Sequence, residues 1–259
     1  MTSYLTCPGH VRSVHFGHAV VVVDVRTGRV ETLLGTAQRL WLALACTGDV
    51  QAAARAADLD IQRVGHLADG LLADGLLEAT STALPWEVAR GAVTTPSWGT
   101  QEVPAGLPPT RSLPRGQLVL AAAALVVVLL VRDAGRRERS FARMINLLRV
   151  MTRRPGRHAT RQATDLALNC VRQMAYVVPC RIACLEESIA AMLVLVVTGQ
   201  SAVWCHGVAT DPIRLHAWIT VDGVPVAEPA SIARYTPLFQ IPDPGQTGDR
   251  TETGEHRQP

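Results

Sequence analysis

Cys184 has the sequence context of a nucleophilic thiol. It stands directly before residues 185–198, a strongly apolar stretch of helical length that carries two glutamates in its first turn and is followed by Gly199, a residue typical of helix ends. The unpaired N–H groups and the positive dipole end of a helix start stabilise a thiolate, which is the reactive form of cysteine. Because cysteine is also a common small buried residue, the assignment needs support from elsewhere in the chain.

His216 and Glu228 supply that support. The segments on either side of Asp222-Gly223 have the composition of two short strands joined by a tight turn. A hairpin that turns there brings His216, at the start of the first strand, close to Glu228, just past the end of the second. We expect Glu228 to hydrogen-bond one ring nitrogen of His216 while the other faces Cys184, which gives a nucleophile, a base and an orienting acid. Asp222 is the second candidate for the acid, although it lies in the turn.

The other cysteines offer weaker sites. Cys180 lies four residues before Cys184, outside the predicted helix, and Cys205 is followed by His206. These residues and His216 fit no standard zinc spacing, so we expect no metal. The opening residues lack the apolar core of a secretory signal, so we expect a cytoplasmic protein with reduced thiols. The six cysteines are Cys7, Cys46, Cys170, Cys180, Cys184 and Cys205.

The composition excludes several chemistries. All 25 basic residues are arginines, and the chain has no lysine. A P-loop lysine, a Schiff-base lysine and a Ser-Lys dyad are therefore excluded. Thiol chemistry needs no lysine, and we expect no cofactor.

Residues 18–79 are predicted to form a small module, a β-hairpin over 18–25 and 30–34 followed by three short helices, which is a winged-helix-like pattern. A DNA-binding role is disfavoured, because the third helix carries one cation, Arg63, against three aspartates, and phosphate contacts dominate DNA affinity. Each helical stretch follows a good N-cap residue, namely Thr36, Asp49 and Asp60.

The rest of the chain divides by composition. Residues 80–115 hold six of the 16 prolines and are predicted to be a linker, and the polar residues 242–259 are predicted to be a disordered tail. We therefore expect an α+β protein with a first domain at 1–79 and a second domain, which contains Cys184, His216 and Glu228, at 116–241.

An apolar run and a basic stretch precede Cys184. Residues 118–131 are 14 apolar residues, fewer than the roughly 20 that a spanning helix needs, so we expect a buried helix, with a membrane-associated segment as the alternative. Residues 132–161 hold ten arginines against Asp133 and Glu138. Apolar residues at helical spacing favour a solvated helical face there, and docking of a partner is the alternative. No aromatic residues interleave with the arginines, which argues against nucleic acid.

The first module resembles the PqqD-like family, a recognition element for precursors of ribosomally synthesised and post-translationally modified peptides. The resemblance rests on VVVVDVRTGRVETLL, on Thr36, Leu40 and Trp41, and on LADGLLADGLLEA. It implies that a leader peptide adds as a strand to the hairpin edge beside the third helix. The implied leader-binding residues are Val30, Thr32, Leu33 and Leu34 on the edge and Arg63, Leu67 and Leu71 in the groove.

The segment CRIACLEESIAAMLVLVVTGQSAVWCHGVATDPIRLHAWITVDGVPVAEPA resembles the lasso-peptide leader peptidase, a transglutaminase-like (papain-like) cysteine protease, and the resemblance extends over residues 118–240. It implies Cys184 as nucleophile and His216 as general base and later acid. The third position, commonly an aspartate in that family, is Glu228 here, which puts the geometry of its hydrogen bond in doubt. With the first module, the chain is similar to the fused form of a lasso B protein, in which leader recognition and proteolysis share one chain.

That resemblance implies a function and partners. The enzyme would remove the leader of a lasso precursor peptide and free the core N-terminus for macrolactam formation by a separate asparagine-synthetase-like cyclase, a candidate partner for residues 132–161. Two alternatives stay open: acyl transfer to an amine, as in transglutaminases, and a non-catalytic leader-binding adaptor in which the triad with Glu228 is degenerate.

Overall fold

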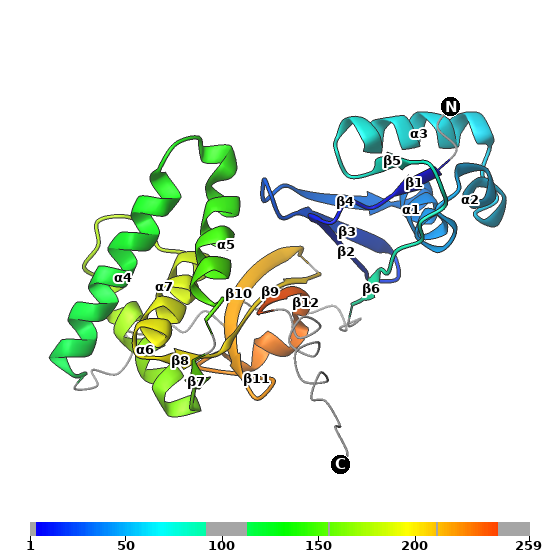
Figure 1. Cartoon of the computed structure of the whole chain (residues 1–259). Coiled ribbons are helices and arrows are strands. Elements are labelled where there is room, and N and C mark those ends of the chain that lie inside the picture. The colour runs from blue at the N-terminus through cyan, green and yellow to red at the C-terminus, as the bar shows by residue number, and fades with distance from the viewer. Residues whose placement is uncertain (1–3, 92–112, 155, 211, 243–259) are drawn as a thin grey trace, which may run out of the picture. The chain divides into compact units, whose positions relative to one another are not determined.

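The chain divides into two compact units, residues 1–95 and 96–259, and each is described here by itself (Figure 1). The predicted tail beyond residue 242 and the part of the predicted linker at 92–112 lie outside the described residues. The computed structural model describes residues 4–91, 113–154, 156–210 and 212–242.

The first unit is built on a four-stranded sheet in the order β4-β3-β2-β6. Strand β3 is buried at every position from Ala19 to Val23, because its β-branched side chains are covered on both faces of the sheet. A separate antiparallel pair is made by β1 (Tyr4–Thr6) and β5 (Glu78–Thr80). The strands of the larger sheet are β2 (Val11–His15), β3 (Ala19–Asp24), β4 (Val30–Leu34) and β6 (Ala89–Arg90).

Three helices complete the first unit: α1 (Gly35–Thr47), α2 (Val50–Ala56) and α3 (Ile61–Ala73). Two of the predicted N-caps are present, since the Asp49 and Asp60 carboxylates accept hydrogen bonds from N–H groups in the first turns of their helices. The prediction for Thr36 is wrong. Strand β4 runs directly into α1, with Gly35 at a φ of 54° making the bend, so the residue before the helix is Leu34, which offers no side-chain cap.

The first unit is larger than the predicted module. Strand β2 pairs with β3 ahead of the predicted hairpin, and β6 returns to pair with β2 in parallel. The predicted linker start at residue 80 is therefore wrong. Its first part packs onto the unit: the Trp86 N–H donates to the carbonyl of Ala45 at 2.9 Å, and the Trp86 ring meets Trp41 edge-on at 5.5 Å between ring centroids.

The second unit places helices beside a four-stranded antiparallel sheet of order β11-β10-β9-β12 (Figure 1). Helix α7 (Cys184–Val197) packs against α4, α5, α6 and the strand β10. The other elements are α4 (Arg115–Asp133), η1 (Arg137–Arg139), α5 (Ser140–Met151), β7 (Arg157–His158), α6 (Arg161–Ala175), β8 (Gln200–Ser201), β9 (Val203–Ala209), β10 (Arg214–Val221), β11 (Val224–Pro225), η2 (Ala230–Arg234) and β12 (Thr236–Ile241).

Helix α4 differs from the predicted buried helix. It has 19 residues, and its outer face is exposed, with Val119 71% and Leu130 66% accessible to solvent. Within the described residues it is the one helix long and apolar enough to cross a membrane. Of its 18-residue apolar stretch, 22% is buried inside the protein. Core helices of soluble proteins pass the same test of length and composition, so these two properties do not assign a membrane to the chain. The buried stripe of α4 consists of Ala121, Ala124, Leu125 and Val128.

The basic stretch after α4 is mostly a solvated helical face, as predicted. Helix α5 buries Met144, Ile145 and Leu148, while eight of the ten arginines over 132–161 are exposed. Arg143 is an exception. Its guanidinium donates to the carbonyls of Val131, Arg132 and Arg136 and so satisfies the end of α4.

Candidate active site

Cys184 is the first residue of α7. Ala183 precedes it in extended conformation, and the Ala183 N–H donates to Glu186 Oε2 at 3.1 Å. The first intrahelical bond joins the Glu187 N–H to the Ala183 carbonyl at 3.0 Å. Because the first N–H groups of a helix have no intrahelical acceptor, the start of α7 offers donors and the positive end of the helix dipole beside the thiol.

His216 lies on β10 between a thiol and a carboxylate. Its Nε2 is 2.8 Å from Glu228 Oε2, and the Cys184 side chain lies close enough to the ring to act on the pKa of His216. With Nε2 engaged by Glu228, Nδ1 is the ring nitrogen that remains for the thiol. Burial acts to lower the pKa of His216, but the hydrogen bonds and charges of Cys184 and Glu228 outweigh burial and raise this pKa to about 9. The ring therefore carries its proton at neutral pH.

Aromatic rings border His216. The Trp218 ring stacks on it at 6.0 Å between centroids and an interplanar angle of 12°, and the Tyr235 ring lies at 5.2 Å. Burial is the main cause that raises the pKa of the Tyr235 phenol, and the charges of Cys184 and Glu228 add to it. Tyr235 is thus close to the same three groups, a proximity that its position in the sequence does not reveal.

Glu228 is brought to His216 by the predicted hairpin. Asp222 and Gly223 both have positive φ, 53° and 73°, which is the geometry of a two-residue type I′ turn. After β11, the Val226 N–H still donates to the Ile219 carbonyl at 3.0 Å. The Glu228 side chain, 6% exposed, follows directly. The second candidate acid, Asp222, does not meet His216: it is exposed in the turn, with its carboxylate 3.7 Å from His158.

Arg172, on α6, is a site residue that sequence reasoning missed. Its Nη1 donates to the Ala227 carbonyl at 2.9 Å, and its Nη2 lies 3.5 Å from Glu228 Oε1. Its Nε donates to Glu187 in the first turn of α7. The sequence gives only a weak indication of this role. Arg172 follows buried Leu168 by four residues, and this spacing places it beside the buried face of the helix.

Residues 126–240 match the family model described as the transglutaminase-like superfamily. They form a transglutaminase-like domain. The superfamily includes cysteine peptidases and acyl transferases, and the matched range contains Cys184, His216, Glu228 and Arg172. No curated protein and no solved structure matches the chain.

The other cysteine and histidine candidates of the transglutaminase-like domain lie elsewhere. Cys180 is exposed ahead of α7 and meets Arg132. Cys205 is buried, which raises the pKa of its thiol to about 11. Burial lowers the pKa of His206 to about 4, and its ring packs among Trp204, Phe141 and Phe239. Across the described ranges no three His, Cys, Asp or Glu side chains are arranged so that they could hold a metal ion.

In the first unit, β4 pairs with β3 alone among the described strands and so forms an edge of its sheet. Thr32, Leu34 and Arg63 are exposed and Val30 is half-buried. Leu33 and Leu71 are 9% and 7% exposed and belong to the hydrophobic core, against which Leu67 packs. Leu33, predicted on the edge, and Leu71, predicted in the groove, thus have their side chains in the core, which corrects the expectation that these side chains face a leader peptide.

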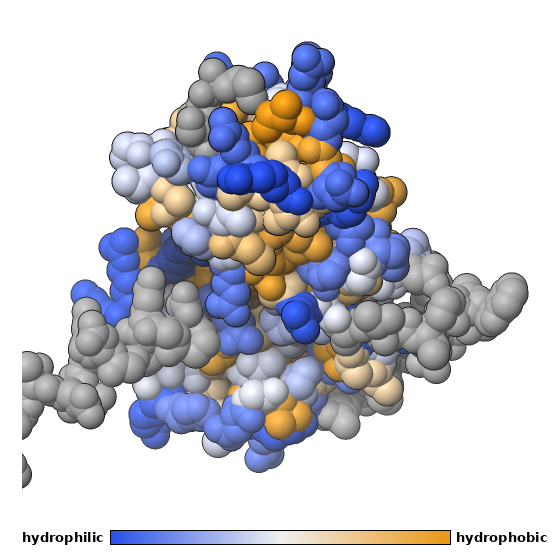
Figure 2. All heavy atoms as spheres, turned by 90° about the vertical axis from the view of Figure 1, so that its right-hand side faces the viewer, coloured by the Kyte–Doolittle hydropathy of each residue, from blue (hydrophilic) through white to orange (hydrophobic). Residues whose placement is uncertain are grey.

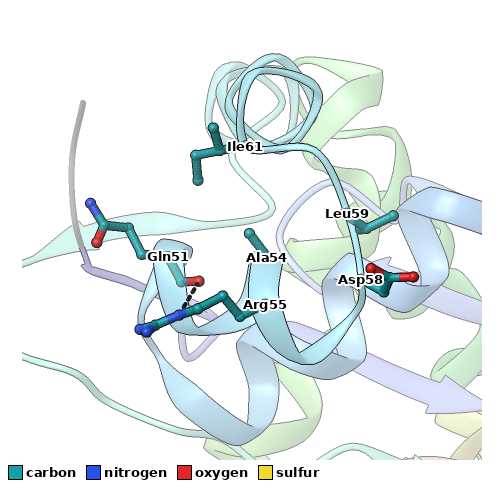
Figure 3. A pocket seen from close by; sticks show the side chains of 6 residues that line it. All are labelled: Gln51, Ala54, Arg55, Asp58, Leu59 and Ile61. Atoms are coloured by element: carbon teal, nitrogen blue, oxygen red, sulfur yellow. Dashed lines mark hydrogen bonds between the residues drawn. The ribbon is translucent and has the colours of Figure 1, made fainter.

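A cavity of about 540 Å³ opens elsewhere on the first unit, between α2 and α3 (Figure 3). None of the predicted leader-binding residues lines it. On the face that Figure 2 presents, apolar patches lie between hydrophilic side chains. The large apolar residues that are exposed in the described part of the first unit are Leu34, Ile61 and Leu84. The cavity is lined by Gln51, Ala54, Arg55, Asp58, Leu59 and Ile61.

Proposed function

We propose that this protein is a cysteine peptidase that removes the leader from a lasso precursor peptide. The observation that carries the proposal is the connected row of Cys184 at a helix start, His216, and Glu228 at 2.8 Å from the imidazole, within a transglutaminase-like domain. Nucleophile, base and orienting acid thus stand in the order that acyl-transfer chemistry requires.

The chemistry follows from this arrangement. The Cys184 thiolate attacks the scissile carbonyl, and the N–H groups at the start of α7 stabilise the oxyanion that forms. The protonated His216 then donates its proton to the departing amine, which becomes the N-terminus of the core peptide. The leader remains on Cys184 as a thioester. His216, now neutral, takes a proton from water, and the resulting hydroxide releases the leader as a free acid and regenerates the thiolate.

Leader capture is assigned to the first unit. The edge strand β4 offers unpaired backbone groups to an extended peptide, Thr32 and Leu34 are exposed on that strand, and Arg63 is exposed on α3. Main-chain hydrogen bonds to an added strand supply affinity, and side chains supply register. Holding the leader there raises the effective concentration of the scissile bond at Cys184.

Acyl transfer to an amine is the second candidate, because the superfamily includes acyl transferases and both reactions pass through the same thioester. The two differ in what attacks it, water or an amine. A non-catalytic adaptor is less well supported, since Glu228 reaches His216 despite its longer side chain. The partners in the peptidase proposal are the precursor and an asparagine-synthetase-like cyclase that consumes the freed amine, with the exposed arginines of 132–161 as its docking face.

Mass spectrometry of a lasso precursor incubated with the full chain tests the proposal. Hydrolysis gives leader and core masses that sum to the precursor plus one water, whereas acyl transfer gives a leader that carries the added amine. Cys184→Ala should abolish both products, and Cys180→Ala is the matched control that should preserve them. Cleavage that persists in Cys184→Ala would remove the nucleophile assignment, and an intact precursor with the wild-type chain would favour the adaptor.

A further inference from the structure

We infer that Arg172 is a positioning residue of this site, which holds Glu228 and the first turn of α7 in the geometry in which Glu228 meets His216. The inference rests on the proposed function for the importance of that geometry. The contacts that support it belong to the transglutaminase-like domain alone.

One guanidinium joins three parts of the domain. From α6, Arg172 donates Nε to Glu187 on α7, Nη1 to the Ala227 carbonyl at 2.9 Å, and Nη2 toward Glu228 Oε1 at 3.5 Å. Glu187 lies three residues after Cys184, so the same side chain is connected to the helix that carries the thiol. The rigid planar fork of arginine suits such simultaneous bonds, which a lysine ammonium cannot reproduce.

The burial of Glu228 makes this contact necessary. Its side chain is 6% exposed, and a buried carboxylate is costly unless both of its oxygens are paired. His216 binds Oε2 and Arg172 faces Oε1. Arg172 is itself 31% exposed, and its positive charge is shared between Glu228 and Glu187. The other titratable groups around the imidazole are Cys184, His206 and Tyr235.

Arg172 also explains how a glutamate can serve at this position. Its extra methylene adds a rotatable bond, which on its own loosens the hydrogen bond to His216. Arg172 restricts that freedom at both ends, because it faces the carboxylate and also binds the carbonyl of Ala227, the preceding residue. Ala227 has a φ of 54°, a conformation that non-glycine residues seldom adopt, so this carbonyl contact stabilises a backbone that delivers Glu228.

A positioning role and a purely electrostatic role of Arg172 predict opposite changes in the pKa of His216. If Arg172 acted only as a nearby positive charge, its removal would favour the protonated ring and raise the pKa of His216. If Arg172 positions Glu228, its removal weakens the Glu228–His216 bond and lowers this pKa. The sign of the change therefore separates the two roles, and the measurement requires no peptide substrate.

The test is an NMR titration of His216 in the full chain labelled at histidine, with the resonance assigned from a His216→Gln sample. Arg172→Gln should lower the His216 pKa from about 9 and slow leader cleavage at least tenfold. Arg172→Lys should lie between Arg172→Gln and the wild type, because it keeps the charge without the fork. Gln173→Ala, at an exposed position next to Arg172 on the same helix, is the matched control and should change neither quantity.

A double variant tests whether Arg172 acts through Glu228. Arg172→Gln combined with Glu228→Gln should give the His216 pKa of Glu228→Gln alone. An unchanged or raised pKa in Arg172→Gln, or a further fall in the double variant, overturns the inference. If Arg172→Gln does not fold by circular dichroism, Arg172→Lys carries the test, because positioning predicts a lowered His216 pKa whereas a purely electrostatic role predicts an unchanged one. If the His216 pKa changes as expected but the wild-type chain does not cleave the leader, the result counts against the proposed function and not against the role of Arg172.

Discussion

Replacing Glu228 with glutamine is the most informative perturbation of the site, because it removes the charge while nearly preserving the shape. The pKa of His216 is raised from 6.5 to about 9 by its two partners, against the opposing effect of burial. Because one pKa unit corresponds to about 1.4 kcal/mol, the site favours the protonated imidazole over the neutral one by roughly 3 kcal/mol more than water does. Since Glu228 contributes both a hydrogen bond and a charge, we expect its loss to lower this pKa by at least about one unit.

The effect on cleavage follows from the same contact. An amide at this position can present its NH₂ group to Nε2 and so orient the wrong tautomer, as happens when the acid of a catalytic triad becomes an amide. General acid–base catalysis contributes on the order of 100-fold to 10,000-fold, and we expect Glu228→Gln to lower kcat/KM for leader removal by at least about 100-fold at pH 7.

The assay combines single-turnover cleavage of the precursor, followed by mass spectrometry, with titration of His216 by NMR. Asp222→Asn is the matched control, because its carboxylate is exposed in the turn of the same hairpin, and it should retain cleavage and the His216 pKa. Glu228→Asp should recover part of the activity, since it keeps the charge but shortens the reach. If Glu228→Gln cleaves as fast as the wild type with an unchanged His216 pKa, the role assigned to the acid is refuted.

Three further outcomes are expected. Cys184→Ala should abolish cleavage while leaving leader affinity unchanged in fluorescence anisotropy, and a loss of affinity would show that the variant disturbs more than the thiol. The pKa of His216 in the folded protein lies above 6.5, so the contribution of His216 to the free energy of unfolding is fully present below pH 6.5 and is lost as the pH rises toward 9. Urea unfolding should show this decline in stability with pH. An equally steep decline in Glu228→Gln would contradict it. Leu34→Glu on the β4 edge should weaken leader binding at least about tenfold by adding a charge where an apolar side chain is exposed; the control Leu84→Glu should not, and equal affinities would place the leader elsewhere.

Local signals predicted several structural features of both units. The hairpin that joins His216 to Glu228 depends on an Asp-Gly turn and on short flanking strands, and these are properties of neighbouring residues. The caps at Asp49 and Asp60 were likewise local, since each aspartate bonds N–H groups within three residues. The start of α7 at Cys184 followed from a long apolar stretch with a clear beginning and end.

Features that depend on distant partners were missed. Strands β1 and β6 have three and two residues and pair across more than 70 positions of sequence, so their composition carries little information. Arg172 meets Glu228 across 56 positions, and its role depends on how α6 packs. Helix α4 was expected to be buried because it is apolar, but composition does not say how many neighbours cover a helix, and one face remains open.

The two-residue turn of the His216–Glu228 hairpin limits how the length of this chain can vary. Strand pairing places Thr220 opposite Pro225 and Val221 opposite Val224. The two residues of the turn therefore fix how many residues separate the imidazole of His216 from the carboxylate of Glu228. Side chains of a strand alternate between faces, and inserting or deleting one residue at Asp222-Gly223 would turn the Glu228 carboxylate away from the imidazole. Among homologous chains, this turn should therefore be free of insertions and deletions.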